Sequence, residues 1–287
     1  MRSWQFLKEF DGKLQSKKPA FQLTLKFFNM MQQNKRLHQF FLTMLSVGNC
    51  LNSGTPRGTA YGFKLKTLSK FCGSKDTRNK KTILHYCLQI AEITDATFVR
   101  ENEQVVVNVQ KYMDALKKNI VSDTDPVWDS TGPIMPAVQE FCIVYKQLMR
   151  VGFEDELAQL EQMKQQLADV KKNIPTLQSK NPNDKYTEVF NAFADKADFQ
   201  IQRALEIASE AKESYQKCLR AFAEPLAESM NDFLKNLEEF AAALEKCQED
   251  NRLEKEKQER EAKRAARKAQ MEKDAKNGKS ANSVGGN

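Results

Sequence analysis

Apolar residues in the second half of the chain repeat every three or four positions, which is the spacing of one face of an α-helix. Three such stripes cover residues 153–177, 186–219 and 226–244. Prolines punctuate the stripes and predict the turns between them: Pro175, Pro182 and Pro225. We therefore predict three long amphipathic helices joined by short turns and packed as an antiparallel bundle. Such stripes form a protein core far more often than a cofactor site.

The first half of the chain carries the same spacing, interrupted by segments rich in glycine, proline and polar residues. We predict helices within residues 4–47, with a turn at residues 16–19 where Pro19 starts a new helix. Shorter helices follow at residues 64–71 and 82–93. Residues 121–136 contain several prolines and predict a loop, and we expect Trp128 to anchor this loop to the core.

Composition agrees with a mainly helical protein. The 287 residues are 40% hydrophobic and 29% charged, with a mean hydropathy of −0.64, and only 11 are glycine and 8 proline. No apolar run reaches the length of about 18 residues that a membrane span needs, and the N-terminus is unlike a secretory signal. We predict an all-α, cytoplasmic protein: an elongated helical bundle with long antiparallel helices and a C-terminal charged helix.

Candidate catalytic and metal-binding residues are few. The only histidines are His38 and His85, and neither has a second type of ligand nearby at metal spacing. We expect His85 to lie in a helix with one ring nitrogen hydrogen-bonded. The six cysteines are widely spaced and are expected to be buried apolar residues rather than disulfides: Cys50, Cys72, Cys87, Cys142, Cys218 and Cys247. We predict no enzyme, no metal and no cofactor.

Residues 48–63 concentrate four of the 11 glycines between two helical segments. A glycine-rich loop can cradle a phosphate, but no Gly-Lys-Ser/Thr follows and no strand precedes this one. The simpler interpretation is a tight connection in which glycine and asparagine supply unusual backbone angles.

The end of the chain is basic. Residues 252–279 hold eleven Lys or Arg and six Asp or Glu, so +5 of the net charge of +7 lies there. We predict a charged helical tail over residues 251–277 and disorder over residues 278–287. The tail is either a solvated extension or a binding site for an acidic filament, nucleic acid or anionic lipid. It lacks aromatic residues, which disfavours nucleic acid. Its candidate residues are Arg260, Lys263, Arg264, Arg267 and Lys268.

Several motifs occur in an order that resembles the formin homology 2 domain. Residues 46–52 read Ser-Val-Gly-Asn-Cys-Leu-Asn, a glycine-bearing loop follows, and Gly62-Phe63 comes next. After a short helical segment, residues 80–86 read Lys-Lys-Thr-Ile-Leu-His-Tyr. The resemblance covers residues 1–258, and we assign residues 1–250 to the C-terminal part of such a domain.

The resemblance implies an actin-binding helical module that dimerises head to tail and assembles unbranched filaments without chemistry of its own. Such a domain contains, in order, a lasso, a linker, a knob, a helical bundle and a post. The glycine loop of the post lies where the lasso of the partner chain docks. By resemblance, the residues that line this acceptor site are Gly48, Asn49, Asn52, Gly62 and Phe63.

The resemblance also implies an actin contact on a basic residue before the helix that contains His85. The matching position is Lys75, and Lys70 and Lys80 are neighbours that can share the role. Actin is acidic, so lysines on a polar turn can make charge-assisted contacts with it.

The sequence departs from the family pattern in two respects. Cys50 stands where the family usually has an aromatic residue, and Cys72-Gly73 replaces a commonly charged pair. Met1 aligns after the lasso, the linker and most of the knob, so we expect that this chain alone does not close a two-lasso ring. The expected partners are therefore actin and a formin chain whose lasso docks on the post.

Alternative functions follow from the same features. The chain can be a helical scaffold or regulator that binds other formins through the post without nucleating filaments. A coiled-coil scaffold with no actin role conflicts with the glycine loop, which interrupts the heptads. A nucleic-acid-binding protein would depend on the tail and show a steep salt dependence.

Overall fold

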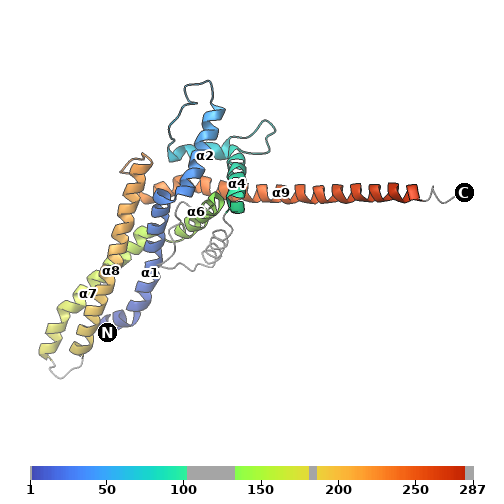
Figure 1. Ribbon diagram of the computed structural model, residues 1–287. Coiled ribbons are helices and arrows are strands. Elements are labelled where there is room, and N and C mark those ends of the chain that lie inside the picture. Colours follow the sequence, from blue (N-terminus) through green and yellow to red (C-terminus); the bar gives the residue numbers. More distant parts are fainter. Residues whose placement is uncertain (1, 102–132, 181–185, 282–287) are drawn as a thin grey trace.

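The computed structural model describes residues 2–101, 133–180 and 186–281 (Figure 1). Helices make up nearly all of these segments, and the only β-type pairing among them is an isolated bridge between Lys75 and Thr82. The prediction of an all-α fold is confirmed. The elements are α1 (Arg2–Gln33), α2 (Lys35–Leu51), the 3-10 helix η1 (Leu65–Thr67), α3 (Leu68–Gly73), α4 (Ile83–Glu101), α6 (Ile134–Leu148), α7 (Phe153–Lys180), α8 (Tyr186–Ala221) and α9 (Met230–Ala281).

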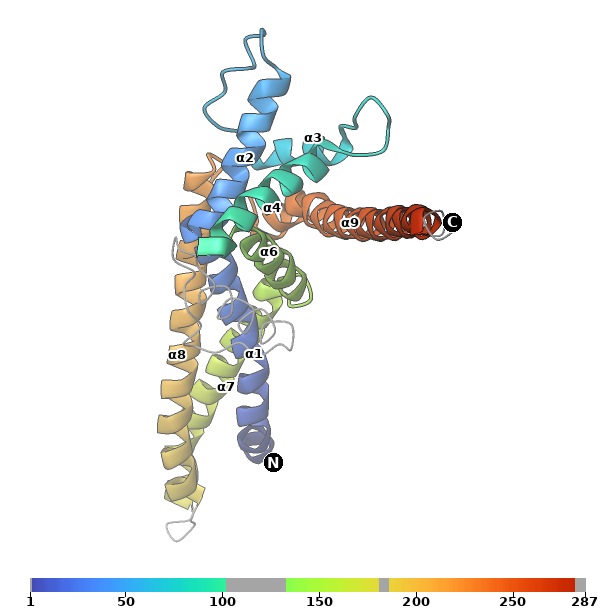
Figure 2. The same cartoon turned by 45° about the vertical axis from the view of Figure 1, so that its right-hand side comes forward.

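Helices α1, α7 and α8 lie side by side and form an elongated arm (Figures 1 and 2). Edge-to-face aromatic contacts close the arm at its outer end, where Phe10 of α1 packs on Phe193 and Trp4 packs on Phe190 of α8. The predicted bundle therefore exists with α7 and α8 antiparallel, but its third helix is α1, which runs parallel to α8. The prediction placed the helix after Pro225 in that position, because stripe periodicity does not say which helices meet.

The second body, called the head here, consists of α2, η1, α3, α4, α6 and the first part of α9. Phe41, Phe141 and Phe240 from three of these helices meet in its core. The buried hydroxyl of Tyr145 donates a hydrogen bond of 2.8 Å to the Leu234 carbonyl, which ties α6 to α9. The chain thus runs from the arm to the head and returns to the arm through α7 and α8. It then enters the head again with the first part of α9, which continues beyond the head as the tail.

The predicted turn at residues 16–19 is wrong, because α1 continues through Pro19. Two contacts hold the helix together there. Leu14 and Phe21 are buried on either side of the proline. Lys17 is buried as well, and its ammonium group donates to Glu156 at 2.8 Å and to Gln159 at 2.6 Å on α7. Packing on both flanks outweighs the cost of a helical proline, which is about 3 kcal/mol.

Two other predicted breaks also fall inside helices. Helix α7 continues through Pro175, and α6 begins at Ile134 with Pro136 in its first turn, where a missing N–H leaves no hydrogen bond unmade. The buried carboxylate of Asp95 accepts hydrogen bonds from the first two amides of α6, at 2.6 and 2.7 Å. The predicted loop before residue 133, with Trp128, lies outside the described residues. The predicted turn at Pro182 lies outside them as well.

The turn at Pro225 is confirmed, since α8 ends at Ala221 and α9 begins at Met230. Leu226 lies in this turn and is exposed, so it does not belong to the third stripe. Helix α9 then continues without a break from the head into the basic tail and projects far from the rest of the molecule (Figure 2). Helix α9 ends at Ala281.

Candidate functional site

The glycine loop, residues 52–62, leaves the C-terminal end of α2 and returns to the head at Phe63. Asn49, in the last turn of α2, holds the far end of the loop with both groups of its side-chain amide. Its Nδ2 donates to the Ala60 carbonyl at 2.9 Å, and its Oδ1 accepts from the Ala60 amide at 3.1 Å. A single side chain therefore closes the loop against the helix.

Asn52 starts the loop and caps α2. Its backbone amide and its side-chain Nδ2 both donate to the Gly48 carbonyl, at 3.1 and 2.8 Å. Its own carbonyl accepts from the amide and the hydroxyl of Thr55, at 3.1 and 2.8 Å. Asn52 thus supplies hydrogen-bond donors to the Gly48 carbonyl, one of the last carbonyls of α2, which the end of a helix leaves without a partner inside the helix. It also fixes the first turn of the loop.

The backbone of the loop requires glycine at two positions, and neither is among the predicted acceptor residues. A Cβ on Gly58 would lie 2.5 Å from the Asn52 carbonyl oxygen, and Gly54 has a φ of +80°. The predicted glycines are less constrained, because a Cβ on Gly62 meets nothing within 4 Å and one on Gly48 lies 3.5 Å from the Phe71 ring. The shape of this loop therefore depends on Gly54 and Gly58.

Phe63 is half-buried rather than a free surface residue. Its ring packs edge-on against Phe41, with 6.3 Å between the ring centroids, and it also packs against Phe71, with 6.1 Å between the centroids. Phe63 therefore joins the loop to the core of the head. The exposed apolar side chains here are instead Leu51, the last residue of α2, which is 62% exposed, and Tyr61 in the loop, which is 102% exposed. All five predicted acceptor residues lie at the ends of this one loop.

The second loop of the head, residues 74–82 and called the basic loop here, joins α3 to α4. Asp76 organises it: its Oδ1 accepts from the Lys80 amide at 2.9 Å, and its Oδ2 accepts from the Tyr86 hydroxyl at 3.0 Å. The backbone hydrogen bond from Lys80, followed by that from the Tyr86 hydroxyl, lowers the pKa of Asp76. Asn79 adopts the left-handed conformation that completes the turn, with a φ of 56°.

The basic loop presents cations to solvent. Lys75 and Lys80 are exposed, as is Lys70 on the preceding α3. The loop also exposes Arg78, which the sequence interpretation omitted. No ion pair links any of these four cations to the part of the chain that the structure describes. The backbone around Lys75 is nevertheless fixed by its bridge to Thr82, so the position of this lysine is defined.

Both loops project from the same end of the head, away from the arm (Figure 1). The predicted acceptor residues and the predicted actin-contact lysines therefore belong to loops at one end of the head.

His85 joins the basic loop to α9; it lies in α4 with a hydrogen-bonded ring nitrogen, as expected, and its second ring nitrogen also has a neighbour. Its Nδ1 accepts from the Thr82 amide at 3.0 Å, and its Nε2 lies 3.4 Å from Asp250 Oδ2. The side-chain amide of Asn251 on α9 donates from its Nδ2 to the backbone carbonyl of His85 at 3.1 Å. His85, the third residue of α4, thus accepts a hydrogen bond from the backbone amide of Thr82, which precedes the helix. A glutamate at this position makes the same bond in a capping box.

The same histidine lies 3.3 Å from Cys247 Sγ, so the structure assembles a Cys–His–Asp group that the sequence interpretation did not expect. Burial raises the pKa of the Cys247 thiol, which opposes formation of the nucleophilic thiolate. The group packs α4 on α9, and Nδ1 of His85 already accepts a hydrogen bond from the Thr82 amide. Among the described residues, no three His, Cys, Asp or Glu side chains are placed to hold a metal ion.

The cysteines are free, and Cys87, Cys142, Cys218 and Cys247 are buried as predicted. The prediction of burial is wrong for Cys50, which is exposed on the outer face of the last turn of α2, and Cys72 is only half-buried. In residues 2–101, 133–180 and 186–281, no helix has the length and apolar run needed to cross a membrane.

The tail candidates all lie on the exposed part of α9 beyond the head. Arg260 approaches Glu256 at 3.5 Å. No ion pair joins the other four to a described residue: Lys263, Arg264, Arg267 and Lys268.

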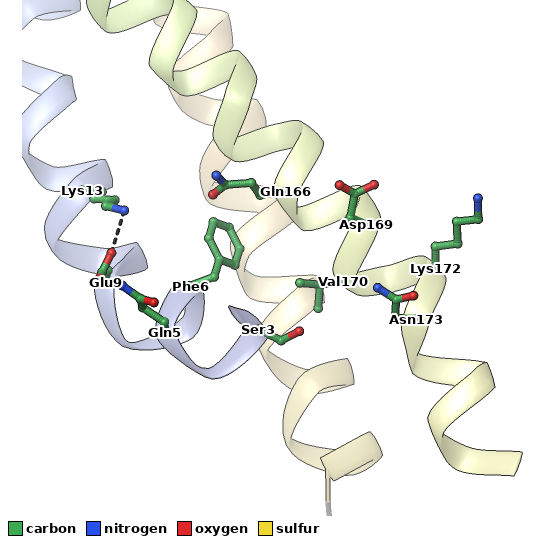
Figure 3. Close-up of a pocket in the computed structure, with 10 residues that line it drawn as sticks. All are labelled: Ser3, Gln5, Phe6, Glu9, Lys13, Gln166, Asp169, Val170, Lys172 and Asn173. Atoms are coloured by element: carbon green, nitrogen blue, oxygen red, sulfur yellow. Dashed lines mark hydrogen bonds and ion pairs between the residues drawn. The ribbon is translucent and has the colours of Figure 1, made fainter. Parts of the chain in front are cut away.

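A cleft of about 680 Å³ opens between α1 and α7 near the outer end of the arm (Figure 3). Phe6 points into it, while Asp169 and Lys172 line the opposite wall on α7. Glu9 on the α1 wall is already paired with Lys13 at 2.6 Å. None of the predicted site residues lies in this cleft.

Comparison with known proteins places the chain in a family. A family model described as Formin Homology 2 Domain matches residues 1–245, which include the arm, both loops and the part of α9 inside the head. The chain belongs to the formin homology 2 family. The basic tail lies outside the matched residues.

Relatives align along most of the chain. Formin-F of Dictyostelium discoideum is 26% identical over 96% of this chain and 20% of its own length. Disheveled-associated activator of morphogenesis 1-A of Xenopus laevis is 26% identical over 88% of this chain and 20% of its own length. Protein diaphanous of Drosophila melanogaster is 24% identical over 77% of this chain. The chain spans about a fifth of the length of the first two relatives.

Proposed function

We propose that this chain binds actin and takes part in the assembly of unbranched actin filaments and in the organisation of the actin cytoskeleton in the cytoplasm. It acts by binding, with no catalytic step, metal or cofactor. The observation that carries the proposal is the family match across residues 1–245.

The basic loop is the proposed actin contact, with Lys75 as its main residue and Lys70 and Lys80 beside it. An exposed lysine on a fixed backbone keeps its full charge for a partner and loses little backbone freedom on binding. Acidic side chains of actin would accept charge-assisted hydrogen bonds from it. The contact weakens as salt rises, because exposed charges are screened.

The glycine loop is the proposed acceptor for the lasso of a second formin chain. Asn49 and Asn52 hold the loop in one shape, and Leu51 and Tyr61 expose apolar surface on which an aromatic side chain can pack. In this proposal Gly48, Gly62 and Phe63 shape the site, and its contacts come from the exposed side chains around them.

Actin assembly in the presence of the whole chain tests the proposal. We expect the chain to change the rate of filament assembly, and Lys75→Ala to reduce that effect several-fold. Lys164→Ala is the matched control, since Lys164 is an exposed lysine on α7 of the arm. No effect of the chain on assembly, or equal losses for the two variants, would contradict the proposal.

A second candidate function is regulation of other formins by capture of their lasso, without nucleation by this chain. The exposed Leu51 and Tyr61, at the two ends of the glycine loop, favour it, because neighbouring exposed apolar side chains can form a docking site. A pull-down with a complete formin tests it, and a formin whose lasso tryptophan is replaced serves as the control. Capture that is unchanged by this replacement excludes lasso docking.

A further inference from the structure

The cations of the tail gather on one face of α9. At 3.6 residues per turn, six of them fall within an arc of about 140° around the helix. These residues are Lys257, Arg260, Lys263, Arg264, Arg267 and Lys268.

This face points away from the core of the head. The buried stripe of α9, which includes Leu237, Leu244 and Asn251, lies on the opposite side of the helix. Beyond the head, that buried side continues as a row of alanines: Ala262, Ala265, Ala266 and Ala269. Because α9 is unbroken from Met230 to Ala281, the head fixes the direction in which the cationic face points.

The charge of this face is largely uncompensated. Glu256 lies inside the arc just before the six cations and pairs with Arg252 and Arg260. Asp274, six residues after the last of them, falls at the same angle of the helix. Residues 262–271 contain four cations and no acidic residue. A row of like charges along a helix is unfavourable unless a partner of opposite charge neutralises it.

Two apolar residues lie at the centre of the same face, one near each end of the cationic row. Leu253 is 49% exposed and Met271 is 64% exposed. The face therefore combines a row of cations with apolar side chains that point in the same direction.

We propose that this face of the tail binds the surface of a lipid bilayer that contains anionic headgroups. A straight row of cations fits a flat surface, and apolar side chains can enter the boundary between headgroups and acyl chains. Each lysine or arginine near such a surface contributes to binding, and clusters of four to eight on a helix suffice to recognise anionic lipid. The absence of aromatic residues from residues 252–281 disfavours base stacking with nucleic acid.

Vesicle sedimentation with the whole chain tests this. We expect binding to vesicles of phosphatidylcholine and phosphatidylserine in equal parts, weak binding to pure phosphatidylcholine, and loss of binding at high salt. The matched variant carries Ala262→Lys, Lys263→Ala, Ala266→Arg and Arg267→Ala, which keeps composition and net charge but moves two cations to the alanine side. Its affinity should fall by about 30-fold, and circular dichroism checks that it stays helical.

A second measurement shows which face meets the lipid. Met271→Trp and Ala269→Trp place a fluorescent side chain on opposite faces of the helix, in a chain whose Trp4 and Trp128 are replaced by phenylalanine. Only Met271→Trp should shift its emission to shorter wavelength when the anionic vesicles are added.

Three outcomes would overturn the proposal. These are equal binding to both kinds of vesicle, undiminished binding by the charge-moved variant, and tighter binding of the tail to filaments or duplex DNA than to anionic vesicles. The vesicle experiments contain no actin, so their result is separate from that of the proposed function.

Discussion

The side chain of Asn49 makes two hydrogen bonds with the backbone of Ala60: its Nδ2 donates to the Ala60 carbonyl, and its Oδ1 accepts from the Ala60 backbone amide. This pair connects the end of α2 to the far end of the glycine loop, eleven residues later. The loop is otherwise exposed, so this contact accounts for much of its fixed shape.

Replacing Asn49 should therefore loosen the loop without unfolding the head. Asn49→Ala removes both hydrogen bonds at an exposed site, with an expected cost of about 1 kcal/mol. Hydrogen exchange of the amides in residues 52–62 should become faster, while exchange in α4 stays unchanged. Asn173→Ala on the exposed side of α7 is the control, and slow exchange of the loop in Asn49→Ala would contradict this account.

Two glycines of the same loop should respond differently to alanine. At Gly58 the added Cβ would lie 2.5 Å from the Asn52 carbonyl oxygen, whereas at Gly62 it meets nothing within 4 Å. We expect Gly58→Ala to destabilise the loop by about 2 kcal/mol and Gly62→Ala to change its stability by less than about 0.5 kcal/mol. Local opening measured by hydrogen exchange compares the two, and equal effects would refute the assignment.

The long helices and the position of both loops could be predicted from sequence, because apolar periodicity and glycine clusters are local signals. The pairing of α1 with α8 could not, since nothing local distinguishes α1 from α9 as the third helix. Helix continuity through Pro19 was also hidden, because it depends on contacts from other helices. The glycine motif marked the correct segment, but the requirement for Gly58 could not be predicted, because it comes from a contact with Asn52 that only the folded loop creates.

The basic loop should depend on pH through Asp76. Hydrogen bonds to its carboxylate lower its pKa, so it stabilises the loop above its unfolded value of about 3.9. This stabilisation is lost as pH falls from that value through the lower folded pKa. Exchange of the Lys80 amide with solvent should therefore accelerate in acid, and Asp76→Asn should remove that pH dependence. A wild-type loop that stays equally protected across this range would argue against the role of Asp76.

The buried ion pair between α1 and α7 should matter more for stability than an exposed pair on the same helix. Lys17→Ala leaves Glu156 and Gln159 without their donor, with an expected loss of about 3 kcal/mol in the free energy of unfolding. Lys13→Ala removes the exposed pair with Glu9 and should cost less than about 1 kcal/mol. Denaturant titration measures both, and similar losses would show that the Lys17 contact is unimportant.

Co-sedimentation of the whole chain with actin filaments, repeated with Lys75→Glu, tests the central claim most directly. We predict that the chain pellets with filaments, that Lys75→Glu weakens this binding at least tenfold, and that the variant with moved tail charges binds as the wild type does. Failure of the chain to pellet, or equal binding by wild type and Lys75→Glu, would contradict the assignment of the basic loop as the actin contact.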